Sequence, residues 1–360
     1  MGRKIAIVLF NLGGPDTGDD VQPFLQNLFK DPAIIGAPLP IRAILARIIS
    51  RSRAPAVKKN YAMMDAGGGS PLLPETKKQA EALTAMLASR LPEDDVRCFI
   101  AMRYWHPFTE EAAAEVKAWG ADEVILLPLY PQFSTTTTGS SLTAWNKAYK
   151  GAAKTICCYP FAEGLISAHV DRIMEAYRKA GEPDNVALLL SAHGLPETIV
   201  KSGDPYQWQC ETMGEMIAGR VPADWDIIPC YQSRVGPLKW IGPATEEVIA
   251  EQAKAGKNIL IAPIAFVSEH IETLVELGEE YRLVAEQAGA SSYTRVEAVG
   301  VNTDFITMLA DEVLASLAGP EQIRSCAGSR ICPHDWKRCP HRADKQVAGK
   351  LVNSRKKAQA

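Results

Sequence analysis

Eight short runs of β-branched and aliphatic residues recur along the chain, and most of them are separated by helical patterns. The runs cover residues 4–10, 96–102, 123–129, 155–159, 185–191, 225–231, 258–266 and 294–299. Segments between them, such as 75–90, 109–119, 166–180 and 243–255, have helical periodicity. Strands that alternate with helices form right-handed crossover units and parallel sheets. The pattern therefore predicts an α/β protein.

The runs divide into four and four, which predicts two Rossmann-like domains, each a parallel four-stranded sheet flanked by helices. We place the N-terminal domain at residues 1–165 and the C-terminal domain at residues 166–319. Residues 320–360 form a cysteine-bearing extension that ends in a basic tail. A chain of 360 residues is long enough to bury two such cores.

Polar and special residues follow directly after six of the runs. These loops are residues 11–15, 103–107, 130–134, 192–196, 232–237 and 267–270. In open parallel sheets, ligands bind in the crevice outside the carboxyl ends of the strands. The six loops therefore predict one ligand-binding cleft lined by both domains.

An acidic row begins where the run at 258–266 ends. Glu269, Glu272, Glu276 and Glu280 recur every three or four residues, so we expect them to share one helix face. A solvated acidic face is the simpler alternative. His193 follows another strand, and imidazole exchanges protons near neutral pH and ligates metals. Together, the histidine and the carboxylates are the parts of a metal-handling or proton-abstracting site.

Charge and hydropathy exclude several classes of protein. The net charge of −3 gives no general attraction to nucleic acid. No apolar stretch reaches the ~18 residues of a membrane span, and the N-terminal apolar run is too short for a signal peptide. We therefore expect a cytoplasmic protein. In that compartment its eight cysteines are thiols or metal ligands rather than disulfides.

Residues 29–53, called the lip below, are apolar, punctuated by proline and edged by Arg42, Arg47, Arg51 and Arg53. Core packing is one interpretation of the lip. The other is an amphipathic cover over a ligand or a membrane surface.

Two loops rich in glycine and hydroxyl residues, 67–71 and 134–141, match neither a P-loop nor a dinucleotide fingerprint. Nucleotide binding is therefore not indicated, although such loops can donate hydrogen bonds to carboxylates.

Three cysteines lie close together near the C-terminus, at Cys326, Cys332 and Cys339. Thiols at this spacing indicate an iron–sulfur cluster or a zinc site. Because His334 and His341 lie in the same stretch, a zinc site is an alternative to the iron–sulfur cluster. A fourth thiol would come from elsewhere in the chain. The candidates are Cys98, Cys157, Cys158, Cys210 and Cys230, and the strand-end pair Cys157 and Cys158 is preferred.

Taken together, the motifs resemble those of ferrochelatase. They are segments 11–15, 67–71, 103–107, 130–141, 191–196, 203–206, 232–237 and 268–277, in order along residues 5–310. The resemblance implies two Rossmann-like domains around a porphyrin cleft. It also implies insertion of Fe²⁺ into protoporphyrin IX to make protohaem, with both substrates as the chain's small-molecule partners.

Several residue roles follow from this resemblance alone. His193 and Glu272 match the catalytic and iron-binding pair, and Glu276 and Glu280 continue a route for iron or departing protons. The residues implied to bind or shape the site for porphyrin are Arg53, Tyr61, Ser70, Arg103, Tyr104, Ser233 and Trp240. The lip would make peripheral contact with the inner membrane.

The C-terminal cysteines resemble the [2Fe–2S] extension of one ferrochelatase subset. The implied ligands are Cys158, Cys326, Cys332 and Cys339. Their spacing departs from the animal pattern Cys-x2-Cys-x4-Cys, and Ala168 stands where the animal enzymes have their upstream cysteine, so the fourth ligand stays open.

Other functions share parts of this pattern. A coproporphyrin ferrochelatase has nearly every motif, and a cobalt chelatase shares the fold and the acidic helix. A non-enzymatic haem or porphyrin carrier would keep the cleft without needing a proton acceptor. Both a monomer and a homodimer are compatible with the sequence.

Overall fold

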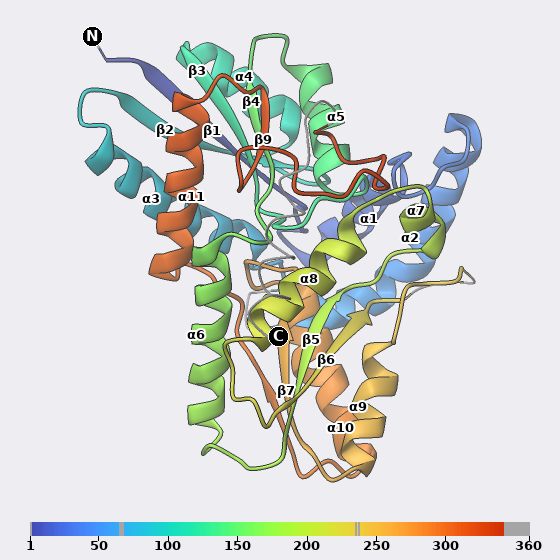
Figure 1. Cartoon of the computed structure of the whole chain (residues 1–360). Coiled ribbons are helices and arrows are strands. Elements are labelled where there is room, and N and C mark those ends of the chain that lie inside the picture. Colours follow the sequence, from blue (N-terminus) through green and yellow to red (C-terminus); the bar gives the residue numbers. More distant parts are fainter. Residues whose placement is uncertain (1, 65–67, 235, 237, 342–360) are drawn as a thin grey trace.

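The computed structural model describes residues 2–64, 68–234, 236 and 238–341 (Figure 1). Gly67 of the glycine-rich loop and the basic tail at residues 350–360 lie outside the described residues.

The first sheet has five parallel strands in the order β2-β1-β3-β4-β9. These are β1 (Lys4–Asn11), β2 (Asp95–Met102), β3 (Glu123–Pro128), β4 (Lys154–Cys158) and β9 (Ile323–Ser325). The sequence predicted only four strands in this sheet. The fifth strand, β9, comes from the C-terminal extension and pairs with β4. With three residues, β9 is too short to show a strand pattern in the sequence.

The second sheet has the predicted four parallel strands, in the order β6-β5-β7-β8. These are β5 (Val186–His193), β6 (Asp226–Gln232), β7 (Asn258–Pro263) and β8 (Ser292–Arg295). The predicted α/β class with two parallel sheets is confirmed.

The helices cover both faces of each sheet. They are α1 (Val21–Phe29), α2 (Leu39–Ala62), α3 (Leu72–Arg90), α4 (Thr109–Trp119), α5 (Thr138–Ala148), α6 (Glu163–Lys179), α7 (Glu197–Lys201), α8 (Tyr206–Ala218), α9 (Thr245–Lys254), α10 (Tyr281–Gln287) and α11 (Thr303–Ala318). Alternation along β1 shows the arrangement. Val8 and its neighbours on one face pack with α4 and α5, whereas Ile7 and its neighbours pack with α3.

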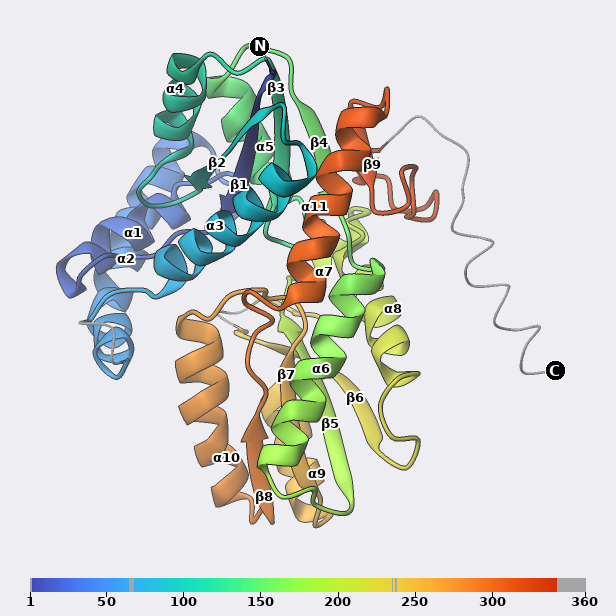
Figure 2. The same ribbon diagram turned by 90° about the vertical axis from the view of Figure 1, so that its left-hand side faces the viewer.

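Helices α6 and α11 connect the two halves of the molecule. Helix α6 carries the chain from β4 to the second sheet, and α11 returns it to β9. The two helices lie side by side (Figure 2). One apolar core runs through both halves, since it includes Ile7 of β1 and Leu188 of β5. The domain boundary that we place at residue 165 falls in the first turn of α6 and stays a prediction.

Candidate active site

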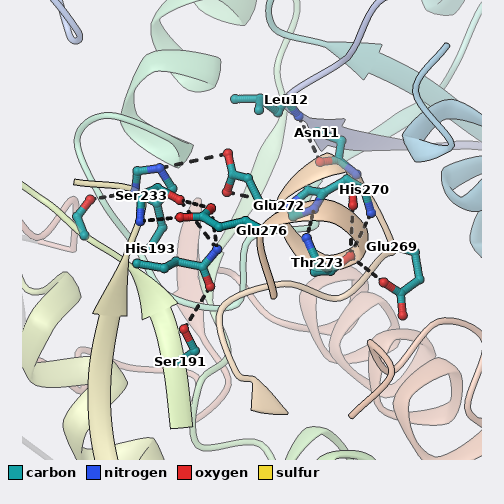
Figure 3. Close-up of polar contacts among 12 residues, drawn as sticks. Asn11, Leu12, Ser191, His193, Ser233, Glu269, His270, Glu272, Thr273 and Glu276 are labelled. Carbon is teal, nitrogen blue, oxygen red and sulfur yellow. Dashed lines mark hydrogen bonds and ion pairs between the residues drawn. The ribbon is translucent and has the colours of Figure 1, made fainter. Parts of the chain in front are cut away.

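The carboxyl ends of β5 and β6 lie together at one edge of the second sheet. His193, the last residue of β5, is the register partner of Gln232, the last residue of β6. The chain that follows β7 brings Glu272 and Glu276 to the same place (Figure 3). The expected cluster of polar groups at the strand ends is therefore present in this sheet.

His193 is held in one orientation and presents one ring nitrogen to Glu272. Its Nδ1 lies 2.6 Å from the carbonyl oxygen of Gly194 and can only donate to it. In the neutral imidazole, Nε2 then carries the lone pair. Nε2 lies 4.0 Å from Oε1 of Glu272, and the two side chains are 36% and 25% exposed. A base and a carboxylate thus face each other at a point that a ligand can reach.

The acidic row lies on a π-helix, Glu272–Glu280, rather than on an ordinary α-helix. A π-helix has i→i+5 hydrogen bonds and is wider than an α-helix, so residues four apart lie almost in line. Glu272, Glu276 and Glu280 therefore form one row, from the half-buried first carboxylate to the exposed last one. Asn60 of α2 donates a 3.0 Å hydrogen bond to Glu280.

Glu269 does not belong to this row, so the expectation that four carboxylates share one face was wrong. Glu269 accepts hydrogen bonds from Arg295 at 2.8 Å and from the backbone of Ala298 at 2.9 Å, and it also binds the hydroxyl of Thr273. These partners turn it to the opposite side of the helix (Figure 3). Glu269 is a structural ion-pair partner there.

Glu276 is surrounded by donors from the end of β6. Ser233 donates its backbone N–H at 2.8 Å and its hydroxyl at 2.5 Å, and Gln232 donates its side-chain amide at 3.1 Å. Tyr281 adds its hydroxyl at 2.9 Å. Burial, followed by the charge of Glu272, raises the pKa of Glu276 above its ordinary value. A carboxyl group with a raised pKa can take up and release protons closer to neutral pH.

Glu272 has one oxygen without a partner. Its Oε2 is buried and accepts no hydrogen bond from the described residues, and it lies 4.0 Å from Nε2 of His270. His270 accepts a hydrogen bond at Nδ1 from the backbone of Thr273, so its Nε2 carries the proton in the neutral ring. Burial lowers the pKa of His270. An unsatisfied carboxylate oxygen in this place is available to a cation or a proton.

Tyr61 and Ser70 come from the other half of the chain and lie near the acidic row. Burial, and then the negative charge of Glu272, raise the pKa of Tyr61. Tyr61 also packs in one apolar cluster with Val275 of the π-helix. A Cβ added at Gly14 would lie 2.5 Å from Cβ of Ser70 and 3.6 Å from the hydroxyl of Tyr61. The loop after β1 therefore fits closely against both side chains.

Arg103 and Tyr104 are bound to a buried aspartate that the sequence did not single out. Arg103 makes a 2.8 Å ion pair with Asp31 and a 2.7 Å hydrogen bond to Ser140. Tyr104 donates its hydroxyl to Asp31 at 2.8 Å. The charge of Arg103 is thus compensated within the chain. Sequence reasoning missed Asp31 because its partners lie far away along the chain.

The loop at 134–141 binds a carboxylate of the chain itself. Asp204 accepts from the hydroxyl of Ser134 at 3.0 Å, and from the backbone and the hydroxyl of Thr135, both at 2.7 Å. The hydrogen-bond donors of Ser134 and Thr135 are therefore already used within the fold.

Arg53 and Trp240 lie on separate elements. The half-buried Arg53 side chain of α2 makes no hydrogen bond or ion pair with another described residue. The half-buried Trp240 lies next to the His193 loop, because a Cβ at Gly194 would be 3.2 Å from its ring.

The lip exposes large apolar side chains, so plain core packing was the wrong alternative. Leu39, Ile41, Ile44 and Ile48 are 54–66% exposed on α2, beside exposed Arg47 and Arg51. Helix α2 lies at the margin of the molecule (Figure 2). Among the described residues, no helix is both long enough and apolar enough to cross a membrane.

The C-terminal cysteines meet the end of β4 in a small apolar cluster. Cys157, Cys158, Cys332 and Cys339 are buried together, and Cys326 packs against them. Gln209 of α8 donates to the sulfur of Cys332 at 3.1 Å and to that of Cys158 at 3.6 Å. A hydrogen bond with Cys332 lowers the pKa of Cys339 to about 7. In the described part of the chain, no three Cys, His, Asp or Glu side chains are already arranged around one metal position.

Two solved structures share this architecture. SirB from Bacillus subtilis with Fe³⁺ has a TM-score of 0.51 at 12% identity, over 88% of this chain and 96% of that one. The sirohydrochlorin chelatase SirB from Bacillus subtilis subspecies spizizenii in complex with cobalt has a TM-score of 0.50 at 10% identity, over 88% and 97%. The fold is therefore that of the chelatases.

The sequence relationships are closer. The sequence model of the family named Ferrochelatase matches residues 4–317. Ferrochelatase of Hyphomonas neptunium is 75% identical over 349 residues, 97% of this chain and 98% of that protein. Ferrochelatase of Caulobacter vibrioides strain NA1000 is 56% identical over 345 residues, 95% and 99%. The chain belongs to the ferrochelatase family, and it is a metal chelatase, a lyase of haem biosynthesis.

Proposed function

We propose that this ferrochelatase inserts Fe²⁺ into protoporphyrin IX to form protohaem, with His193 and Glu272 as the catalytic and iron-binding pair. Metal insertion displaces two pyrrole protons, so a base must receive them. The observation that carries the proposal is the 4.0 Å approach of Glu272 to the free Nε2 of His193. Nε2 accepts the two pyrrole protons one after the other and passes the first to the carboxylate row before it takes the second. The carboxylate of Glu272 stabilises the imidazolium that forms each time.

Glu276 and Glu280 continue this site toward the surface. The unpartnered oxygen of Glu272 and the row of carboxylates behind it support a path for incoming Fe²⁺ or departing protons. Oxygen ligands suit a hard divalent cation. Glu276 is the member with the raised pKa, which suits a group that takes up and releases protons.

Porphyrin recognition is assigned to the surrounding groups. A porphyrin is a large apolar disc with two carboxylates, so it suits apolar walls edged by cations and hydroxyls. Arg53, which has no partner among the described residues, and Ser70 would bind propionates. Tyr61, Ser233 and Trp240 would contact or shape the site. Arg103 and Tyr104 would act through the network around Asp31 rather than as free ligands.

The exposed apolar residues of the lip support peripheral contact with the inner membrane by a protein that is otherwise cytoplasmic. Either a monomer or a homodimer agrees with this arrangement.

A [2Fe–2S] cluster bound by the extension is the cofactor that we propose. Arg330 supports the fit, because it is 5% exposed and donates to the carbonyls of Cys332, Pro333, Trp336 and His341. No carboxylate of the described residues pairs with it. A buried cation without a counter-ion suits an anionic group such as thiolates around iron.

Cys158, Cys332 and Cys339 would hold the cluster, with Cys326 as the fourth ligand that the sequence suggests. When bound, the cluster can carry one electron and tie the extension to the body of the protein. The chelation reaction itself needs no redox step.

Parallel anaerobic assays test the choice of substrate. Purified protein is supplied with Fe²⁺ and either protoporphyrin IX or coproporphyrin, and loss of porphyrin fluorescence is followed. We expect a higher kcat/KM with protoporphyrin IX. A higher kcat/KM with coproporphyrin would show that coproporphyrin is the preferred substrate. Binding of both porphyrins without metal insertion would show that the protein is a porphyrin carrier rather than a chelatase.

A further inference from the structure

Three of the proposed ligands lie in one buried cluster: one from the strand-end pair Cys157 and Cys158, together with Cys332 and Cys339 of the extension. The sulfurs of Cys157 and Cys158 lie 3.6 Å apart, and Gln209 bridges Cys158 and Cys332 through one amide. A [2Fe–2S] cluster requires four protein ligands. One position is therefore to be filled by another side chain near this group.

His341 has the property expected of the missing ligand. The residue is 6% exposed, and its Nε2 is a buried atom without a hydrogen-bond partner among the described residues. Leaving a buried polar atom unpaired is energetically unfavourable. Binding a metal through the lone pair of a neutral imidazole removes this cost.

The backbone places His341 beside the thiols. Its carbonyl oxygen lies 4.0 Å from the sulfur of Cys339 and accepts a 3.3 Å hydrogen bond from Arg330. The same guanidinium binds the carbonyl of Cys332 at 2.9 Å. Arg330 thus fixes the chain at both ends of the segment 332–341.

Cys326 fits the fourth position less well. It lies just after β9, where its backbone N–H donates to the carbonyl of Cys158 at 3.1 Å, and its side chain is partly exposed.

We propose that His341, rather than Cys326, supplies the fourth ligand, so that the cluster is held by three thiolates and one imidazole. This inference rests on the cluster proposed above. Nitrogen ligation of a [2Fe–2S] centre is chemically established, and replacing thiolate by imidazole raises the reduction potential.

Pulsed electron paramagnetic resonance of the anaerobically purified, dithionite-reduced protein tests the assignment. We expect a directly bound nitrogen that changes when histidine is labelled with ¹⁵N. His341→Cys should retain iron and sulfide, lose this nitrogen signal and have a lower midpoint potential. His334→Ala is the matched control, since His334 is exposed in the same segment, and it should leave the signal unchanged.

The outcomes separate the two proposals. A cluster without histidine nitrogen, or one lost in Cys326→Ser but kept in His341→Ala, overturns the ligand assignment while the cluster stands. Purified protein without iron and sulfide, including protein that contains stoichiometric zinc, overturns the cluster together with its ligand. Retention of the cluster in Cys326→Ser with the nitrogen signal intact supports His341.

Discussion

Oε1 of Glu272 lies 4.0 Å from Nε2 of His193, and each residue comes from a different structural element. His193 ends β5, whereas Glu272 begins the π-helix that follows β7. The contact thus joins a proton acceptor to the first carboxylate of a row. The roles of His193 and Glu272 can be tested separately by substitution.

Glu272→Gln should lower kcat by at least about 10²-fold, the usual lower bound for removing general acid–base assistance. The amide keeps the size of the side chain but cannot hold a negative charge. Glu276→Gln and Glu280→Gln should have smaller effects that grow at low iron. Glu279→Gln is the control on the same helix, because Glu279 is exposed and paired with Arg282. Equal, negligible effects at all of these positions would show that the acidic row is only a solvated helix face without a role in the reaction.

Gly14→Ala should raise the KM for porphyrin by about tenfold or more, which corresponds to ~1.4 kcal/mol. The new methyl group would lie 2.5 Å from Cβ and Oγ of Ser70, so Ser70 must shift from its present position. The KM for Fe²⁺ should change little, since Glu272 and His193 are not displaced. Steady-state kinetics with each substrate varied in turn measure both constants. An unchanged KM for porphyrin would show that Ser70 does not take part in porphyrin binding.

Replacing Ile41, Ile44 and Ile48 by Ser should weaken binding to anionic liposomes. These side chains are 54–62% exposed and flanked by arginines, so they can enter the lipid interface. Liposome flotation measures the bound fraction. Leu283→Ser is the control, because Leu283 is also exposed, at 47%, but lies on α10. Binding that is equal in all variants would place the membrane contact elsewhere.

The unfolding free energy should fall as the pH rises from about 5 to 8, because of Glu312. Burial raises the pKa of this carboxyl from 4.5 to about 7, although Arg324 lies 3.4 Å away. The folded state then binds more protons than the unfolded state in this window, so deprotonation favours unfolding. A shift of this size amounts to roughly 3 kcal/mol.

Chemical denaturation of the wild type and of Glu312→Gln between about pH 4 and 8 isolates the contribution. The difference between them should disappear below pH 4.5 and grow toward pH 8. Glu110→Gln, at an exposed helix position, should follow the wild type. A pH-independent difference would show that Glu312 does not titrate in this way.

Much of the fold follows from local patterns. The continuous apolar runs that form β1 and β5 predict buried parallel strands, and the second of them places His193 at its carboxyl end. Spacing alone also predicts the row formed by Glu272, Glu276 and Glu280. These features depend only on neighbouring residues and on the periods of strand and helix.

Features set by distant partners could not be predicted. Glu269 has the same local spacing as the row but turns away because Arg295 and Ala298 bind it. Asp31 becomes the partner of Arg103 only when the fold is complete. In the same way, β9 exists because β4 offers it an edge.

The most direct test of the account is the rate of iron insertion by His193→Ala. The assay is anaerobic, with Fe²⁺ and protoporphyrin IX, and circular dichroism checks that the variant is folded. We expect the variant to bind porphyrin but to retain less than about a tenth of the wild-type rate, a barrier increase of more than ~1.4 kcal/mol. A folded variant that keeps most of the wild-type rate would contradict the role of His193 as proton acceptor.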